Sequence, residues 1–299
     1  MSDENLAEIR NEKAKKIQHP KGKLTAYERL NLLLDEGSFS EIDQHVASEE
    51  NPEGEAVITG TGTIHGRPVF VFSEDFSVMG GSLGEVVAKK ILKIMDHALE
   101  ARAPIIGIKD SGGARIQEGI SSLFGYAQIF KKNVEASGKV PQISVVVGPS
   151  AGGAVYSPAL TDFIFQVKDI GQLYVTGPAV VKTVTGEDVT FEELGGVEAH
   201  GTKSGVTHQV CETEEQAFEE IRYLMSFLPQ SSSQKPPMFI TEDEPSRVID
   251  SLDSFIPENR NQPYDMEKII LDIVDDGEHY PIQSNYATNI ITSFARING

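Results

Sequence analysis

The chain has 299 residues, 39% of them hydrophobic and 24% charged, which is the composition of an ordinary folded protein and excludes a largely disordered one. The net charge of −19 argues against a nucleic-acid partner, no apolar run approaches the ~20 residues that cross a bilayer, and the N-terminus lacks a signal-peptide pattern, so we expect a cytoplasmic protein without membrane contact. The single cysteine, Cys211, excludes an internal disulfide and a cysteine-built zinc site, and we expect no metal.

The first predicted elements are two helices. Charged and apolar residues with helical spacing predict a helix over 6–18. The pattern from Thr25 to Glu28 is a capping box and predicts a second helix over 29–35. We assign residues 1–54 to an N-terminal helical appendage.

Predicted strands and helices alternate through the middle of the chain. A hairpin at His65-Gly66 joins two strands, and helical spacing then runs from Leu83 to about residue 101. The remaining predicted elements are strands over 105–109, 143–147, 163–167 and 172–175, with helices over about 115–135 and 153–160, after Gly177-Pro178, and from Thr213 to about 228. This alternation predicts an α/β fold with a mainly parallel sheet, whose ligands gather outside the carboxyl ends of the strands.

Two glycine turns of one kind follow two of the predicted strands. The sequence Asp110-Ser111-Gly112-Gly113 leads out of the first, and Ser150-Ala151-Gly152-Gly153 leads out of the second. A glycine pair between a strand and a helix lets a substrate approach the main chain, and the first amides of a helix are unpaired and positively polarised. A lone pair would indicate only a tight loop, but two in succession indicate a site for an oxyanion. A third pair, Gly80-Gly81, also precedes a helix.

Long motifs around these turns resemble a known family. The motifs are KLTAYER over 23–29, DSGGARIQEG over 110–119, GPSAGGAVYSPALTD over 148–162, VTGP over 175–178 and ELGG over 193–196. In this order, and across essentially the whole chain, they resemble the carboxyltransferase β subunit of biotin-dependent acyl-CoA carboxylases, above all the propionyl-CoA carboxylase β chains. The resemblance implies an α/β fold of the crotonase-like (ClpP/crotonase) superfamily.

The family subunit consists of two such domains, and this chain resembles the N-terminal half only. We therefore expect a carboxyltransferase N domain over 55–228, a connector with helices over 229–289, and the start of a second, absent crotonase-like domain over 290–299. A weak internal similarity supports the last assignment, because 291–299 can be aligned with 58–66.

The resemblance implies transfer of CO₂ from carboxybiotin to the α carbon of a short acyl-CoA, propionyl- or acetyl-CoA. The amides of Gly152 and Gly153 would form an oxyanion hole for the thioester, and Gly112 and Gly113 would shape its seat. The implied contacts with CoA come from Gly80, Gly81, Ser82, Ala114 and Arg115. For Arg115 two roles stay open, contact with a CoA phosphate and capping of local carbonyls.

The resemblance also implies partners. Biotin would arrive on a biotin carboxyl carrier protein, loaded by biotin carboxylase, and the second half of each site would come from the second carboxyltransferase domain of another protomer. The full-length family forms homo-oligomers, in particular hexamers. We therefore expect this half to bind acyl-CoA and to be inactive alone.

Three alternatives stay open. Related subunits serve transcarboxylases and sodium-pumping acyl-CoA decarboxylases, and the chain could instead be a non-catalytic CoA-binding module. A serine hydrolase is the third alternative, because Clp-type proteases share the superfamily and Ser150 lies beside a glycine turn. No histidine motif accompanies this serine, and we expect His200 and His208 on the surface.

Overall fold

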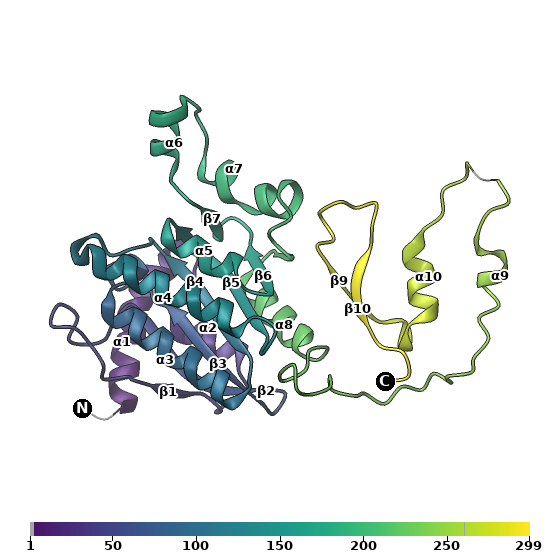
Figure 1. Ribbon diagram of the computed structural model, residues 1–299, viewed down its shortest axis with the longest axis horizontal. Helices are drawn as coiled ribbons and strands as arrows, with labels where there is room; N and C mark the ends of the chain where they lie inside the picture. The colour runs from purple at the N-terminus through teal and green to yellow at the C-terminus, as the bar shows by residue number, and fades with distance from the viewer. Residues whose placement is uncertain (1–2, 260) are drawn as a thin grey trace.

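A mixed eight-stranded sheet forms the centre of the protein, in a computed structural model that describes residues 3–259 and 261–299 (Figure 1). The strand order is β1-β2-β3-β4-β5-β6-β8, with β7 paired to β5. The strands are β1 (Ser40–Ile42), β2 (Val57–Ile64), β3 (Arg67–Glu74), β4 (Ile105–Ser111), β5 (Gln142–Ala151), β6 (Phe163–Val167), β7 (Gln172–Tyr174) and β8 (Gln209–Cys211). Since β3, β4, β5, β6 and β8 are parallel neighbours, the predicted α/β class with a mainly parallel sheet is confirmed.

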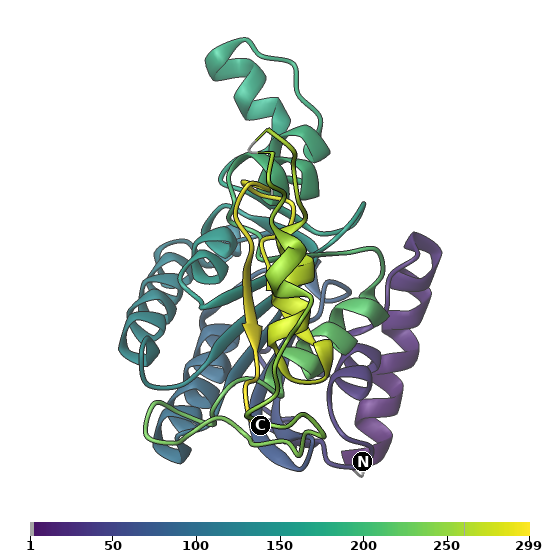
Figure 2. The ribbon, with the colours of Figure 1, turned by 90° about the vertical axis from the view of Figure 1, so that its right-hand side faces the viewer.

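Helices cover both faces of the sheet (Figure 2). The helices are α1 (Asp3–Gln18), α2 (Ala26–Leu33), α3 (Glu85–Ala101), α4 (Ile120–Ala136), α5 (Gly153–Ala159), α6 (Pro178–Thr185), α7 (Phe191–Gly195), α8 (Glu214–Met225), α9 (Leu252–Phe255) and α10 (Met266–Ile273). Buried residues of α3, α4 and α5 form one apolar cluster, and those of α2 and α8 form another. Helices α6 and α7 project away from this body (Figure 1). In the described part of the chain, no helix is long and apolar enough to span a bilayer.

The N-terminal segment is part of the core. Leu30 and Leu33 of α2 are fully buried in the cluster that also holds residues of β2 to β6. Strand β1, which was not predicted, pairs with β2 and extends the sheet. The predicted N-terminal helices are present, and the apolar face of α2 is buried against the sheet. The assignment of residues 1–54 to an N-terminal appendage stays a prediction. The predicted capping box of Thr25 and Glu28 is confirmed.

Two element boundaries differ from the predicted ones near the glycine turns. Helix α4 begins at Ile120 instead of near residue 115, because Gly119, with φ of 54°, separates it from the short turn Ile116–Glu118. Strand β5 continues to Ala151 instead of ending at 147, because β4 and β7 both pair with its last residues. The second glycine turn thus starts from a paired strand end.

The segment after α8 returns to the body of the protein. After an irregular stretch and the short helices α9 and α10, strands β9 (His279–Ile282) and β10 (Thr292–Ala295) form an antiparallel hairpin. Tyr280 is 2% exposed within the main apolar cluster, and the Phe294 ring lies 5.9 Å from that of Phe163. The assignment of 290–299 to a second domain stays a prediction.

Lys90 of α3 is a buried cation and gives a testable pH dependence. The side chain is 1% exposed, and its Nζ donates to the Val57 carbonyl at 3.2 Å. Burial, with Arg10 nearby, lowers the pKa of Lys90 to about 8. Because the unfolded chain keeps this proton up to about pH 10, the charged form is disfavoured in the folded state and stability rises as the pH rises above about 8.

We expect Lys90→Met to increase the free energy of unfolding by about 2 kcal/mol more at pH 7 than at pH 9.5. The charge is unfavourable in the folded state at pH 7 and is mostly lost there by pH 9.5. Urea unfolding of parent and variant at both pH values measures the effect. An equal change at the two pH values would contradict the assignment.

Candidate active site

The three glycine turns lie side by side at the carboxyl ends of β4 and β5. Ser111 of β4 pairs with Ser150 of β5 in parallel register, so the turns that follow them begin level with each other. Leu83, just before α3, forms a parallel bridge with Ala114. The structure therefore brings together the two turns that the sequence singled out and adds the third beside the first.

Backbone packs directly against backbone between these turns. A Cβ atom on Gly113 would lie 2.6 Å from the Ala151 carbonyl oxygen, and one on Gly81 would collide with the Asp110 carbonyl oxygen. Both glycines have positive φ, 102° for Gly113 and 67° for Gly81, a region that side-chain-bearing residues rarely adopt. Glycine is thus required here both by conformation and by close approach.

Several of the turn amides already have acceptors. The N–H groups of Gly112, Gly113 and Gly152 donate to the Gly80 carbonyl at 2.9 Å, the Ser111 Oγ at 3.1 Å and the Tyr174 carbonyl at 3.1 Å. Gly152 is engaged because β7 pairs with the end of β5. The predicted pair of donors, Gly152 and Gly153, therefore has only Gly153 free in this structure.

Two amides without a recorded acceptor among the described residues, those of Ala114 and Gly153, occupy equivalent positions in the two main turns. Across residues 3–259 and 261–299, no hydrogen-bond acceptor lies within reach of the amides of Ala114 and Gly153. Each is the third residue after a member of the paired serines Ser111 and Ser150. Both residues are half-buried. Ala114, which the resemblance suggested as a CoA contact, thus has an amide without a recorded acceptor in the part of the chain that the structure describes, as Gly153 has.

The Arg115 side chain is buried and bonded to other groups of the protein. It is 1% exposed, and its Nη2 and Nη1 atoms form ion pairs with Glu55 and Glu118, both at 2.8 Å. Its Nη2 also donates to the Ser82 carbonyl at 3.2 Å. Of the two roles left open, the structure supports the bonding of local groups, because the guanidinium is buried among its protein partners.

The structure gives no support to a serine nucleophile at Ser150. Its hydroxyl is buried and donates to the Ala154 carbonyl at 3.3 Å. His200 and His208 are half-buried, not surface residues as expected. The His200 Nε2 is 2.7 Å from the Leu173 carbonyl oxygen, and the His208 Nδ1 accepts from the Ile164 amide. Burial lowers the pKa of His208, and neither ring contacts Ser150 by a hydrogen bond.

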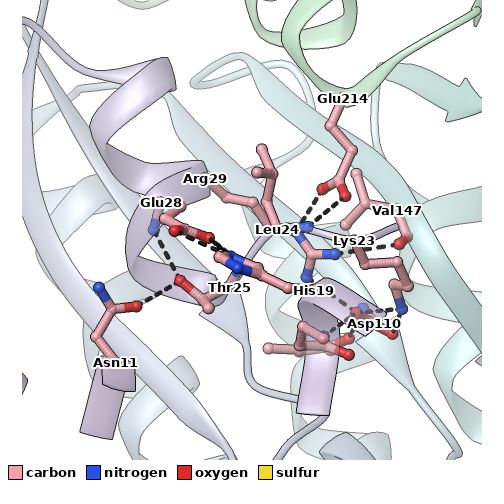
Figure 3. A network of polar contacts seen from close by, with 12 residues as sticks. Asn11, His19, Lys23, Leu24, Thr25, Glu28, Arg29, Asp110, Val147 and Glu214 are labelled. Carbon is pink, nitrogen blue, oxygen red and sulfur yellow. Dashed lines mark hydrogen bonds and ion pairs between the residues drawn. The ribbon is translucent and has the colours of Figure 1, made fainter. Parts of the chain in front are cut away.

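The sequence reasoning missed a buried network of charged side chains next to the turns (Figure 3). Asp110 forms ion pairs with Lys23 and Arg29, and Glu214 pairs with Arg29. Asp110 immediately precedes the first turn, whereas its partners lie far away in the sequence. The available signal was the KLTAYER motif, which contains both Lys23 and Arg29 but indicated only a helix start and the family resemblance.

The comparisons with known proteins show the family of the chain. The family model "Carboxyl transferase domain" matches residues 17–299. The propionyl-CoA carboxylase beta chain of Roseobacter denitrificans is 54% identical over 290 residues, which are 94% of this chain and 57% of that protein. Methylmalonyl-CoA decarboxylase subunit alpha of Veillonella parvula is 52% identical over 307 residues, covering 99% of this chain and 60% of that protein.

Solved structures show the same fold. Transcarboxylase 12S with methylmalonyl-coenzyme A and methylmalonic acid bound superimposes with a TM-score of 0.93 at 44% identity, over 99% of this chain and 61% of that one. This likeness confirms the predicted crotonase-like fold. The chain thus spans little more than half the length of the relatives that it matches. From Ile17 onward its sequence and fold place it in the carboxyl transferase domain family.

Proposed function

We propose that this chain supplies the acyl-CoA half of a biotin-dependent carboxyltransferase site, which moves a carboxyl group between biotin and the α carbon of a short acyl-CoA. The unpaired amides of Ala114 and Gly153, at equivalent positions of two adjacent turns, carry the proposal. The relatives named for propionyl-CoA and methylmalonyl-CoA support a three-carbon acyl group or its carboxylated form.

The two amides act on the thioester oxygen. Loss of the α proton places negative charge on this oxygen, and fixed N–H donors stabilise that charge without reorganisation. One such donor typically contributes about 3–4 kcal/mol to lowering the barrier. Gly112 and Gly113 carry no side chain that would prevent the thioester from binding next to these amides. Carboxybiotin, when bound, supplies the carboxyl group.

The turn before α3 is the proposed contact with the CoA moiety. A cavity of about 570 Å³ borders this turn at Val78 and Met79, and Lys13 and Lys16 also line it. Its volume suits part of a cofactor-sized ligand. We therefore keep Gly80, Gly81 and Ser82 as CoA contacts, whereas Arg115 would act by holding Ser82 in place.

The proposal extends to partners and context. The biotin half of the site would come from a second carboxyltransferase domain, and biotin from a carrier protein, within a cytoplasmic homo-oligomer such as a hexamer. Similar identity to a carboxylase chain, a decarboxylase subunit and a transcarboxylase supports the same acyl-CoA half-site for all three reactions. The partner that carries biotin would then determine which reaction occurs.

The test separates binding from turnover. Titration calorimetry of the purified chain with propionyl-CoA is expected to show binding, because the acyl-CoA half is present. The same chain is expected to show no methylmalonyl-CoA decarboxylation in the presence of free biotin. Turnover by the chain alone would contradict the half-site, and an absence of propionyl-CoA binding would contradict the proposed site.

A further inference from the structure

The carboxylate of Asp110 is the centre of the buried network next to the turns. It is 0% exposed and accepts hydrogen bonds from Gln18 Nε2 at 3.1 Å, Lys23 Nζ at 2.7 Å and Arg29 Nη1 at 2.9 Å. Figure 3 shows Lys23 and Arg29, both from the N-terminal segment, pointing toward it. Because one peptide joins Asp110 to Ser111, the position of this carboxylate is coupled directly to the first glycine turn.

Arg29 connects the ends of two strands and a helix. Its Nε donates to Glu214 Oε2 at 2.6 Å, its Nη1 to Asp110 at 2.9 Å, and its Nη2 to the Val147 carbonyl at 3.3 Å. The planar guanidinium presents its donors in a fixed fork, so these three bonds set the acceptors relative to one another. Val147 lies in β5 just before Gly148, and Asp110 lies at the end of β4. Arg29 therefore links β5 at Val147 to the last residues of β4.

Strand β5 at Gly148 and the turn before α3 also lie close against Asp110. A Cβ on Gly148 would collide with the Asp110 carboxylate and would lie 2.6 Å from Lys23 Nζ. Gly81 lies against the Asp110 carbonyl oxygen in the same way. A shift of Asp110 would therefore be transmitted to all three turns.

The positive and negative charges of the network are equal in number, and its side chains are buried. Two cations, Lys23 and Arg29, face two carboxylates, Asp110 and Glu214, and all four side chains are at most 8% exposed. No charge is left over for a ligand. The function of this network must therefore lie in the position of the backbone that it holds.

We propose that Arg29 and Asp110 are positioning residues that set the separation of the Ala114 and Gly153 amides, and thereby the affinity for the thioester oxygen. The inference rests on the proposed function. Oxyanion donors must be held to within about 0.5 Å, and the first amide follows β4 whereas the second follows β5. Within this network, the bonds of Arg29 to Asp110 of β4 and to the Val147 carbonyl of β5 connect the two strands that lead to these amides.

The experiment compares two ligands that differ only in the carbonyl group next to the sulfur. The purified chain is titrated with propionyl-CoA and with S-propyl-CoA, a thioether that has no carbonyl oxygen. We expect the parent chain to prefer the thioester roughly tenfold. Arg29→Lys keeps the charge, but one ammonium cannot reach all three acceptors, so this preference should fall to roughly twofold while the affinity for CoA itself changes by less than about twofold.

A matched control is available at the opposite edge of the sheet. Arg222 pairs with Asp35 at 2.9 Å and donates to the Leu33 carbonyl, beside the β2–β3 hairpin. Arg222→Lys should leave the thioester preference unchanged. If Arg29→Lys does not fold, Asp110→Asn, which keeps the shape of the side chain, takes its place in the same measurement.

The possible outcomes separate the inference from the proposed function. A parent chain without thioester preference would contradict the oxyanion site and the inference with it. A parent with the preference and an Arg29 or Asp110 variant that keeps it would contradict the inference alone. Equal loss of affinity for CoA, thioester and thioether would also overturn it, because that pattern indicates general loss of structure.

Discussion

Replacing Gly81 with alanine is expected to lower the free energy of unfolding by about 3–4 kcal/mol and to eliminate propionyl-CoA binding. The residue has φ of 67°, so any side chain adds left-handed strain. The new Cβ would also collide with the Asp110 carbonyl oxygen, which is a backbone atom and cannot rotate away. Relief of the collision requires β4 and the turn before α3 to move apart. The movement would displace Ala114, whose segment pairs with Leu83.

Gly138 provides a control with the same strain and no collision. Its φ is 73°, and a Cβ there would have no atom within 4 Å. Gly138→Ala should cost only the conformational strain, about 1–2 kcal/mol, and should leave ligand binding intact. Urea unfolding followed by circular dichroism and titration with propionyl-CoA measure both variants. Equal destabilisation by the two substitutions would show that the turns are not held by the close contact at Asp110.

The glycine turns show how far local sequence patterns predict the site. Alternating strands and helices predict parallel strands, and parallel strands place Ser111 and Ser150 at one edge, as observed. Which amides stay free depends on a later pairing instead. Gly152 donates to Tyr174 because β7 returns to the end of β5. No local pattern encodes that contact, so the replacement of Gly152 by Ala114 as the proposed partner of Gly153 needed the structure.

The buried charges show a second limit of sequence patterns. Arg29 and Asp110 are 81 positions apart in the chain, and both side chains are fully buried. Charged side chains are almost always exposed unless they are paired, so the helical pattern around Arg29 gives no sign that this residue is buried. In the structure, α2 instead brings Arg29 into the centre of the protein.

Replacing Arg29 with methionine is expected to be the most damaging single side-chain truncation considered for this network, at about 3–5 kcal/mol of unfolding free energy. The methionine fills a similar volume but leaves the Asp110 carboxylate with one fewer cation and removes the only ion-pair partner of Glu214 recorded in the described residues. The Val147 carbonyl also loses its Arg29 donor. The cost arises mainly from buried charge left without compensation. Chemical unfolding at neutral pH measures it.

Two further variants distinguish this cause from general loss of packing. Arg222→Met removes an arginine from a partly exposed pair, 25% and 26% accessible, and should cost only about 1 kcal/mol. The double variant Arg29→Met/Glu214→Gln removes one of the uncompensated carboxylates and should therefore be more stable than Arg29→Met alone. If adding Glu214→Gln lowers stability further, the loss in Arg29→Met comes from packing, and the ion pairs are not what holds the ends of β4 and β5 together.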